Sequence, residues 1–409
     1  MPLRPPAGFI SAFYDPLRNP NAPTIGTATG DNASASVTFT APSNVGGSAI
    51  SSYSAISSPG AFIGSAASSP VTVTGLTNGT AYTFAVWATN SYGPSAYSAS
   101  SGSVTPALQR ALFGGGQTGG STRSNTISYV SISSTGNTQY FGDLTVARYG
   151  LACYASSTRA IWAGGEYGNV FFNVIDYVTI TTTGNATNFG TLTANGRYSL
   201  SGASNETRGL QFAGYNASTG PGFTNVIDYV TIATTGNATD FGDTSVTLSD
   251  MGACSSTTRA VYAGGYQGSS PLSGMGYVTI ASTGNSTSFG TLSPSVVWVA
   301  GCSNNTRGLF AGGATSATTT AAVNNIEYIT IASTGNTTDF GDLNTLVIRM
   351  GTASSPTRGV FAGGTNSSGT QINTMDYVTI ASEGNATDFG DLISAVQFLG
   401  GTSNCHGGL

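Results

Sequence analysis

Lysine is absent from this chain of 409 residues, and only 7% of its residues are charged. The 12 basic residues are all arginines, and 17 acidic residues outnumber them, which gives a net charge of −5. Because phosphate backbones are bound by clustered positive charge, this balance argues against a nucleic-acid partner. Ser, Thr, Asn and Gly must supply the polarity of the surface.

Long apolar runs are also missing. No stretch of about 18 apolar residues occurs, so membrane insertion is not expected. The N-terminal segment 1–6 is Pro-rich, and the short apolar segment after it is broken by Asp15-Pro16. This is a poor core for a signal peptide, and we expect the chain to be made and used without Sec export.

Cysteine and histidine are scarce. Cys153, Cys254 and Cys302 each fall a few residues before a recurring arginine, and Cys405 lies near the end. Equivalent positions of successive repeats are generally too far apart for a disulfide, so these side chains are interpreted as small buried apolar residues. With a single histidine, His406, the sequence predicts no metal site, no cofactor and no catalytic residue.

Residues 1–21 are predicted to form an extended N-terminal arm, because three prolines within the first six residues forbid a helix. The arm carries Phe9, Ile10, Phe13 and Tyr14. It is either a disordered terminus or a docking arm whose aromatic side chains bury in a partner, and the sequence leaves both open.

Residues 22–106 alternate apolar and polar residues between turn clusters, which predicts a β-sandwich of short strands. The segment resembles a fibronectin type III domain in the spacing of Leu76 and Tyr82 and in Ala41-Pro42 after an early strand. Phe39 stands where that family usually has Trp. The resemblance implies a spacer or presentation module, and no Arg-Gly-Asp tripeptide suggests integrin-type binding.

Residues 107–409 form an array of six repeats. A recurring arginine marks them at spacings of 49, 49, 51, 48 and 51 residues: Arg110, Arg159, Arg208, Arg259, Arg307 and Arg358. A period near 50 with four strand-like pieces predicts the blades of a six-bladed β-propeller.

The clearest strands of one repeat are expected at 149–153, 159–163, 174–180 and 186–192. The pattern is similar to a kelch repeat, with Gly164-Gly165 after the second strand, Tyr177 on the third, Phe189 on the fourth and Arg148 before the inner strand. The third repeat departs from it, with Ala213-Gly214 and Gln211, which predicts locally weaker packing.

The ends of the array predict how it closes. Residues 110–145 supply three strands of a blade without its first strand, and 398–403 supply a lone first strand. Together they are predicted to complete the sixth blade, so that no sheet edge stays open.

The six recurring arginines form a ring by symmetry. One interpretation is an anion-binding annulus, and the other is six structural ion pairs, which repetition in every blade favours. The expected partners are acidic residues of the third strand or of the Phe-Gly-Asp turns: Asp176, Asp228, Glu327, Asp376, Asp143, Asp243, Asp342 and Asp391.

In each repeat, the loop between the second and third strands should lie on the same face as the loop that leads from the fourth strand to the first strand of the next repeat. These two loops vary most between repeats. Varied loops on a rigid frame usually carry recognition. Their aromatic side chains are predicted to stack on sugar rings or anchor a protein: Tyr167, Phe171, Phe172, Tyr215, Phe223 and Tyr266. The alternative is that these loops merely cover the blade ends.

Enzymes known on kelch-like propellers offer no match. A galactose-oxidase-like copper site needs two histidines, and the Asp boxes of sialidases are absent. The chain is therefore predicted not to be an enzyme.

The whole chain resembles virion structural proteins of marine bacteriophages, especially cyanophages, in its Met1–Ile10 segment and its Thr-Gly-Asn-Ala-Thr-Asp-Phe-Gly-Asp repeats. The resemblance implies a tail fibre, head fibre or decoration protein, assembled in the host cytoplasm and exposed on the particle surface. Residues 1–21 would dock to other virion proteins, and the propeller would face a host-surface glycan or protein. A homo-oligomer, with a trimer as one form, is the expected state. The alternatives are a purely structural virion subunit and a cellular adhesin or polysaccharide-binding module.

Overall fold

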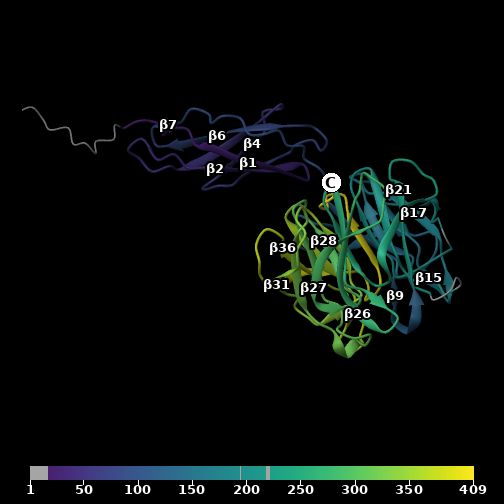
Figure 1. Ribbon diagram of the computed structural model, residues 1–409. Helices are drawn as coiled ribbons and strands as arrows, with labels where there is room; N and C mark the ends of the chain where they lie inside the picture. The colour runs from purple at the N-terminus through teal and green to yellow at the C-terminus, as the bar shows by residue number, and fades with distance from the viewer. Residues whose placement is uncertain (1–16, 194, 218–221) are drawn as a thin grey trace, which may run out of the picture. The chain divides into compact units, whose positions relative to one another are not determined.

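The computed structural model describes residues 17–193, 195–217 and 222–409 (Figure 1). These residues form β-strands and two short 3-10 helices, and no α-helix occurs among them. The fold class is therefore all-β, as predicted. Within the described ranges, no helix has the length and hydrophobicity that crossing a membrane requires.

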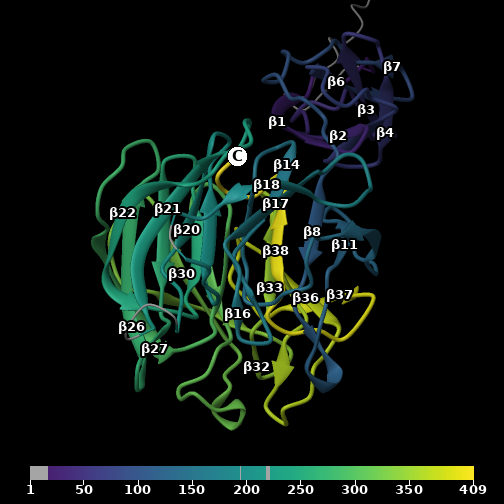
Figure 2. The ribbon, with the colours of Figure 1, turned by 90° about the vertical axis from the view of Figure 1, so that its right-hand side faces the viewer.

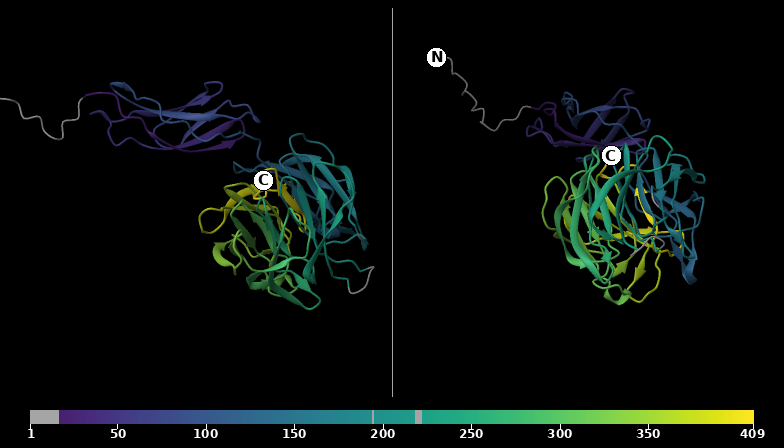
Figure 3. Two further views of the ribbon diagram at one scale, coloured as in Figure 1. Left: turned by 45° about the horizontal axis from the view of Figure 1, so that its top comes forward. Right: turned by 45° about the vertical axis from the view of Figure 1, so that its right-hand side comes forward.

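The chain divides into two compact units, the first ending at Leu108 and the second beginning at Gln109. Figure 3 shows them from two further sides, with the first unit in purple and blue and the second running from blue to yellow. Each unit has its own hydrophobic core and is described by itself.

The first unit consists of two antiparallel sheets, ordered β1-β2-β5 and β4-β3-β6-β7, around one core. Its strands are β1 (Thr24–Asp31), β2 (Ser34–Thr40), β3 (Ser52–Ser58), β4 (Ile63–Ala66), β5 (Val71–Thr74), β6 (Thr83–Asn90) and β7 (Gly93–Pro94). Alternate residues of β2 and β6 are buried, as the period of two predicts. Phe39 packs in this core against Tyr53, with ring centroids 4.6 Å apart.

Tyr82 connects the turn before β6 with the last segment of this unit. The backbone N–H of Thr77 donates a 3.1 Å hydrogen bond to the Tyr82 hydroxyl, next to buried Leu76. The backbone of Tyr82 in turn pairs with Val104. This is the side chain-to-backbone contact that the Leu76 and Tyr82 spacing suggests.

The described end of the expected N-terminal arm belongs to the first unit. Arg18 N–H bonds the Gly46 carbonyl, and Asn19 Nδ2 bonds the Pro94 carbonyl at 2.9 Å. The arm residues Phe9, Ile10, Phe13 and Tyr14 lie outside the described residues.

The second unit contains six antiparallel sheets, here numbered by repeat. Five have four strands, and the fourth sheet has β25 as an additional fifth strand. Sheet 1 is β38 (Gly400–Ser403), β8 (Arg110–Gly114), β11 (Thr126–Ser131) and β12 (Gln139–Asp143). Sheet 2 is β13 (Ala152–Ala155), β14 (Arg159–Ala163), β17 (Val174–Thr179) and β18 (Thr187–Thr191). Sheet 3 is β19 (Ser201–Ser204), β20 (Arg208–Phe212), β21 (Thr224–Thr231) and β22 (Thr239–Leu248).

The other three sheets repeat this order. Sheet 4 is β23 (Gly252–Ser255), β24 (Arg259–Ala263), β26 (Ser270–Thr279) and β27 (Thr287–Val296). Sheet 5 is β28 (Ala300–Ser303), β29 (Arg307–Ala311), β30 (Asn325–Thr330) and β31 (Thr338–Asp342). Sheet 6 is β33 (Gly351–Ser354), β34 (Arg358–Ala362), β36 (Thr374–Thr379) and β37 (Thr387–Asp391).

Short elements occupy the loops between these strands. They are β9 (Gln117–Thr118), η1 (Gly119–Ser121), β10 (Thr122–Arg123), β15 (Glu166–Tyr167), β16 (Val170–Phe171), β25 (Tyr266–Gln267), η2 (Thr319–Ala321), β32 (Val347–Ile348) and β35 (Thr365–Asn366).

The last strand of the chain completes the first sheet. β38 pairs antiparallel with β8, Gly400 opposite Gly114 and Ser403 opposite Ala111, so yellow and blue strands lie side by side in Figure 2. This pairing confirms only that the C-terminal segment supplies the first strand that residues 110–145 lack. The first strand of each sheet also contacts those of two other sheets, in the cyclic order β38, β13, β19, β23, β28, β33 and back to β38.

First strands begin later than predicted. β13 starts at Ala152 and not at Tyr149, and β38 starts at Gly400 and not at Phe398. The residue two positions before each strand has a left-handed backbone, for example Gly150 at φ +68°, which ends the extended pairing there.

The Gly-Asn turn of each repeat docks onto a neighbouring sheet. The Asn185 side chain accepts a 3.0 Å hydrogen bond from the backbone N–H of Asp143, and Asn137 accepts one from Asp391 at 2.9 Å. A Cβ at Gly142 would lie 2.1 Å from the Gly184 carbonyl oxygen, so only glycine allows this approach. The repeated turn is therefore an inter-sheet contact as well as a turn.

Adjacent sheets are matched in side-chain size. In three places the third residue of a first strand faces a glycine of the next sheet: Tyr154 faces Gly209, Cys254 faces Gly308 and Cys302 faces Gly359. A Cβ at Gly308 would lie 2.5 Å from the Cys254 Sγ. This explains why the residue after the recurring arginine is glycine in these repeats and alanine in the others.

Gln211 of the third repeat is buried and bonds the Tyr154 hydroxyl through its Nε2. Gln211 stands where the other five repeats have an aromatic residue, and the tyrosine of sheet 2 reaches this position. The buried Oε1 of Gln211 has no hydrogen-bond partner, and locally weaker packing in this repeat stays a prediction.

Candidate binding site on the loop face

One face of the second unit is formed by two kinds of loop. The residue after each Gly-Gly or Ala-Gly pair forms an antiparallel bridge with a residue of the segment that enters the first strand, as Tyr149 does with Glu166 and Tyr198 with Tyr215. Loops from strand two to three and from strand four to the next strand one therefore lie together. We call this surface the loop face.

An aromatic belt crosses the loop face over sheets 2 to 4. Its members are in ring contact with one another, with centroids 5.1 to 6.3 Å apart: Tyr149, Phe171, Tyr198, Tyr215, Phe223 and Tyr266. Phe171 stacks on Tyr198 at an interplanar angle of 27°, and Tyr215 meets Phe223 edge-on. The belt thus joins four of the six predicted binding residues.

The other two predicted residues lie beside the belt. Tyr167 is 52% exposed, and Phe172 is half-buried, with its N–H bonded to the Gly165 carbonyl at 2.8 Å. Within the described part of the chain, neither residue makes a ring contact with the belt. The equivalent positions at sheets 5 and 6 include Val297, Ala314 and Ile348, which are aliphatic and buried. The loop face is therefore chemically asymmetric on a repeated frame.

A closed circle of backbone hydrogen bonds lies where the loop face meets the first strands. Each residue of this circle lies two positions before a first strand, and we call the six together the mouth ring: Gly150, Ser199, Asp250, Trp298, Arg349 and Phe398. Each N–H bonds the carbonyl of the preceding member at 2.8 to 3.4 Å, and Gly150 bonds Phe398 to close the circle.

Every member of the mouth ring has a left-handed backbone, with φ between +53° and +68°. For non-glycine residues this costs roughly 1 kcal/mol or more each. Trp298, Arg349 and Phe398 are bulky residues in which such a backbone is uncommon. Strained, bulky and chemically different side chains at one repeated position indicate a functional surface.

Arg349 is held between two aromatic rings. Its guanidinium carbon lies 4.0 Å from the centroid of Trp298 and 4.6 Å from that of Phe398. Nη1 donates to Gln397 Oε1 at 3.1 Å, while the buried Nε has no hydrogen-bond partner. Burial lowers the pKa of Arg349, although the nearby Asp250 opposes this.

Asp250 supplies the acidic group of the mouth ring. Its Oδ2 accepts a 2.6 Å hydrogen bond from the Ser249 hydroxyl. Burial raises the pKa of Asp250, while Ser199, Ser249 and Arg349 act in the opposite direction. Burial likewise raises the pKa of Tyr198 to about 12, so this hydroxyl stays protonated at neutral pH.

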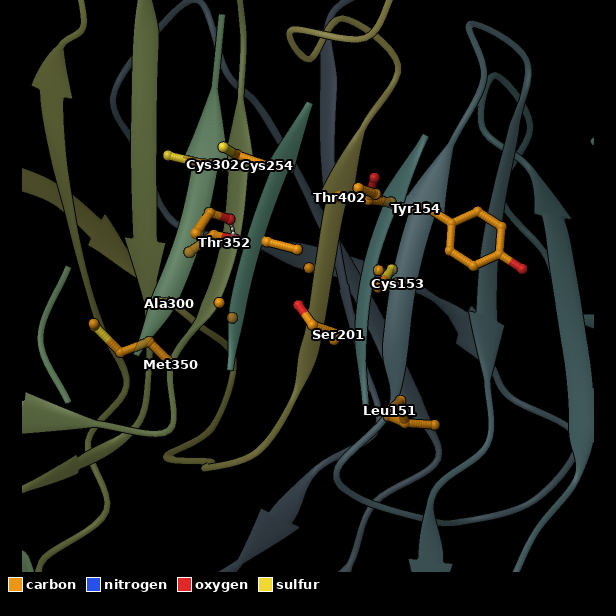
Figure 4. Close-up of a pocket in the computed structure, with 18 of the residues that line it drawn as sticks. Leu151, Cys153, Tyr154, Ser201, Cys254, Ala300, Cys302, Met350, Thr352 and Thr402 are labelled. Carbon is orange, nitrogen blue, oxygen red and sulfur yellow. Dashed lines mark hydrogen bonds between the residues drawn. The ribbon is translucent and has the colours of Figure 1, made fainter. Parts of the chain in front are cut away.

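The mouth ring opens on a cavity of about 150 Å³ among the first strands. Figure 4 shows part of its lining, including Leu151, Cys153, Ser201 and Thr352. Around the cavity, the second residues of the first strands alternate between glycine and a larger residue: Cys153, Gly202, Ala253, Gly301, Thr352 and Gly401. A Cβ at Gly202 would lie 2.5 Å from the Cys153 carbonyl oxygen, so glycine lets the strands converge.

His406 lines the far end of this cavity. Its Nε2 lies 2.9 Å from the Ala155 carbonyl oxygen and 3.1 Å from Ser204 Oγ, and its Nδ1 accepts from Gly408 N–H. These contacts require the proton on Nε2. Burial lowers the pKa of His406, so the ring is a neutral structural element.

The cysteines are free and do not all point the same way. Cys254 and Cys302 are the third residues of their strands and face the next sheet, where Gly308 and Gly359 leave room. Cys153 is a second residue, one position earlier in its strand, and all three residues line the cavity. The prediction that the cysteines are small buried residues is confirmed for Cys254 and Cys302, whereas Cys153 and Cys405 are half-buried.

The six recurring arginines contact tyrosines. Each guanidinium lies 4.5 to 4.9 Å from the ring centroid of the third-strand tyrosine in its own sheet. Each Nη1 also donates to an isoleucine carbonyl in the next sheet, as Arg159 does to Ile232 at 3.0 Å.

The predicted acidic partners of these arginines were wrong. Asp176 lies opposite Trp162 in the strand register, whereas Arg159 lies opposite Thr179. Asp176 instead pairs with Arg148 at 2.8 Å, and both side chains are fully buried. Among the described residues, an ion pair of a recurring arginine joins Arg307 to Glu383, at 3.5 Å.

The mouth-ring side chains were missed at the sequence level, although a signal was present. The residue following each mouth-ring member is always apolar: Leu151, Leu200, Met251, Val299, Met350 and Leu399. The mouth-ring position itself changes chemistry in every repeat. Variation at one position beside a constant one could have identified it.

No cluster of three or more His, Cys, Asp or Glu that could hold a metal ion is found in the part of the chain that the structure describes. In comparisons with known proteins, no family model and no curated protein matches the chain.

Proposed function

We propose that this protein is a bacteriophage virion appendage that binds saccharides on a host surface. In this proposal the second unit is a closed six-bladed kelch-like β-propeller, and the first is a fibronectin type III-like spacer. The loop face is the binding surface. The aromatic belt is the observation that carries the binding function.

Three cyclic relationships support the propeller. The first strands contact one another in a circle, the mouth ring closes through backbone hydrogen bonds, and the recurring arginines link each sheet to the next. The C-terminal strand supplies the first strand of sheet 1, so this sheet has the same four-strand order as the others. Four antiparallel strands per repeat are the composition of a propeller blade.

The spacer proposal has a narrower basis. It rests on the two-sheet core of the first unit and on the bond between Thr77 N–H and the Tyr82 hydroxyl. A fold of this kind does not define a function. We therefore assign recognition to the second unit alone.

Saccharide binding is favoured because aromatic rings gather where loops vary. Sugars present apolar ring faces that stack on aromatic side chains, and tyrosine hydroxyls can bond sugar hydroxyls. Belt residues such as Phe171 and Tyr215 are half-buried, so each keeps part of its ring at the surface. Many weak sites on one particle would give useful avidity.

The virion assignment rests on the resemblance of the Met1–Ile10 segment and the repeat sequence to marine phage structural proteins. In this proposal residues 1–21 dock to other virion proteins and the second unit faces the host. Catalysis is not part of the proposal. His406 Nε2 lies 3.1 Å from the Ser204 hydroxyl, but this nitrogen carries the proton that it donates to the Ala155 carbonyl, so it cannot accept a proton from that hydroxyl.

The test is binding of the full chain to intact candidate host cells and to their purified lipopolysaccharide. Tyr198→Ala removes the residue at the centre of the belt, which contacts Tyr149, Phe171 and Tyr215. Tyr140→Ala is the matched control, because Tyr140 is a 56% exposed tyrosine on β12 outside the belt.

Saturable binding that Tyr198→Ala weakens and Tyr140→Ala preserves would support host attachment through the loop face. If no host binds while incorporation into particles depends on residues 1–21, a purely structural virion subunit is the better conclusion. Equal loss in both variants would contradict the assignment to the belt.

A further inference from the structure

The mouth ring and the cavity below it adjoin the aromatic belt, since the ring centroid of Phe398 lies 5.3 Å from that of Tyr149, but they use different residues. The belt spreads over the loops of sheets 2 to 4, whereas the mouth ring takes one residue from the entrance to each first strand. Five of these six residues bear side chains, and all six line the cavity. The site therefore lies where the six repeats converge.

We propose that the mouth ring binds a single neutral pyranose ring, such as the terminal sugar of a surface glycan. This inference deepens the proposed saccharide-binding function and rests on it. It assigns the ligand contacts to Asp250, Trp298 and Arg349, with Phe398 and Ser199 completing the wall.

The size of the cavity favours one ring. A volume of about 150 Å³ is of the order that accommodates a single six-membered ring or a few water molecules. Glycines at the second position of three first strands let the strand backbones approach closely, which keeps the cavity narrow at that level. A branched oligosaccharide could enter only with one terminal residue.

The chemistry of the mouth favours adjacent hydroxyl groups. Asp250 offers acceptors only, and Arg349 offers donors only. A sugar hydroxyl can donate to the carboxylate while its neighbour accepts from the guanidinium. The rings of Trp298 and Phe398, which already contact Arg349 at 4.0 and 4.6 Å, supply apolar surface for the C–H face of the sugar.

The charges favour a neutral ligand. The mouth ring holds one acidic and one basic side chain, and each influences the other electrostatically. On the outer side, Arg123 and Glu166 form a second pair at 3.8 Å. A carboxylate sugar would meet the repulsion of Asp250, whereas a neutral sugar would leave the balance unchanged.

Backbone strain supports selection of these side chains for their chemistry. Glycine would satisfy φ at every mouth-ring position, as Gly150 does at +68°. Trp298 and Arg349 instead adopt +60° and +63°. Bulky residues held at a position suited to glycine are expected where the side chain is needed.

The experiment measures binding of methyl glucopyranoside, methyl galactopyranoside, methyl mannopyranoside and glucuronate to the full chain by calorimetry and ligand-observed NMR. Asp250→Asn removes one charge and keeps the left-handed backbone favourable, because Asn tolerates that conformation. Asp339→Asn is the same change at an exposed site on β31. Trp298→Gly removes the ring, and Trp298→Phe retains an apolar face.

We expect at least one neutral glycoside to bind in preference to glucuronate. Asp250→Asn should weaken it by about tenfold, since the hydrogen bond that the sugar hydroxyl donates there is no longer made to a charged acceptor, and Asp339→Asn should leave it within about twofold. Trp298→Phe should restore binding that Trp298→Gly removes. An unchanged thermal midpoint in Asp250→Asn would exclude unfolding as the cause.

Two results would overturn the inference. One is the absence of binding by every neutral glycoside, and the other is preferred binding of glucuronate that strengthens in Asp250→Asn. If cells bind through Tyr198 while Asp250→Asn has no effect, the proposed function stands and the mouth-ring inference fails. If neutral glycosides bind at the mouth but no cell surface does, the site stands and the attachment function fails.

Discussion

The guanidinium of Arg358 donates a 3.2 Å hydrogen bond to the carbonyl of Ile132, which lies 226 residues earlier in the chain. Arg259 makes the same contact with Ile331 of the next repeat, also at 3.2 Å. The last repeat is therefore related to the first as each repeat is to its successor. This equivalence leads to the first prediction.

Arg259 also bonds the Ala332 carbonyl, so the matched comparison for Arg358 is Arg110, which bonds the Ile180 carbonyl at 2.9 Å. Arg358→Gln and Arg110→Gln should destabilise the second unit by similar amounts, about 1 to 2 kcal/mol, through the lost carbonyl bond and the lost contact with tyrosine. Chemical denaturation of the full chain measures both free energies of unfolding. If the array were open in solution, Arg358→Gln would cost clearly less than Arg110→Gln, and that result would contradict closure.

Size matching between sheets predicts non-additive substitutions. Gly308→Ala should cost about 1 to 3 kcal/mol, because its Cβ would lie 2.5 Å from the Cys254 Sγ. Cys254→Ala opens that space, so the double variant should be more stable than the sum of the single changes predicts, by at least about 0.5 kcal/mol. A double-mutant cycle measured by denaturation checks this, and simple additivity would refute it.

Ala213 stands where other repeats have the first glycine of the Gly-Gly pair, and it adopts φ +48°. Ala213→Gly should stabilise the unit by up to about 1 kcal/mol, because it relieves a left-handed backbone. Gly264→Ala is the reverse change in sheet 4, where the new Cβ would lie 2.8 Å from the Val296 carbonyl oxygen. It should destabilise by more than Ala213→Gly stabilises. Opposite signs in thermal unfolding would support the backbone explanation, and equal signs would not.

The single histidine predicts a pH dependence of stability. Burial lowers the pKa of His406 below its ordinary value of 6.5. The unfolded chain therefore binds a proton more readily than the folded chain below pH 6.5. The free energy of unfolding is therefore not reduced by His406 above that pH. It decreases as pH falls below it, by at most about 1.4 kcal/mol per pH unit.

His406→Gln should remove this slope between pH 7 and pH 5, whatever it does to stability at pH 7. The difference between the two proteins isolates the histidine, since no other histidine occurs in the chain. Denaturation midpoints at several pH values provide the measurement. A parallel decline in both proteins would assign the effect to other groups.

Local sequence predicted the strands of the repeats well. β14 lies at Arg159–Ala163, as expected from its apolar run, and β38 pairs with β8, as expected from the missing first strand. These features depend on period-two alternation and on counting strands, which a chain reveals without knowledge of its neighbours. The belt residues Phe171 and Tyr215 were found in the same way, as aromatic residues in loops of varied length.

The partners of those side chains could be known only from the tertiary structure. Arg159 contacts Tyr177 and the next sheet, while Asp176 pairs with Arg148, because strand register decides which side chains meet. Asp250, Trp298 and Arg349 are separated by about 50 residues each and come together because six first strands converge and turn left-handed at one end. The sequence by itself determined the all-β repeat and its strands, since these follow from local alternation. The site depends on distances between repeats, and only packing sets those distances.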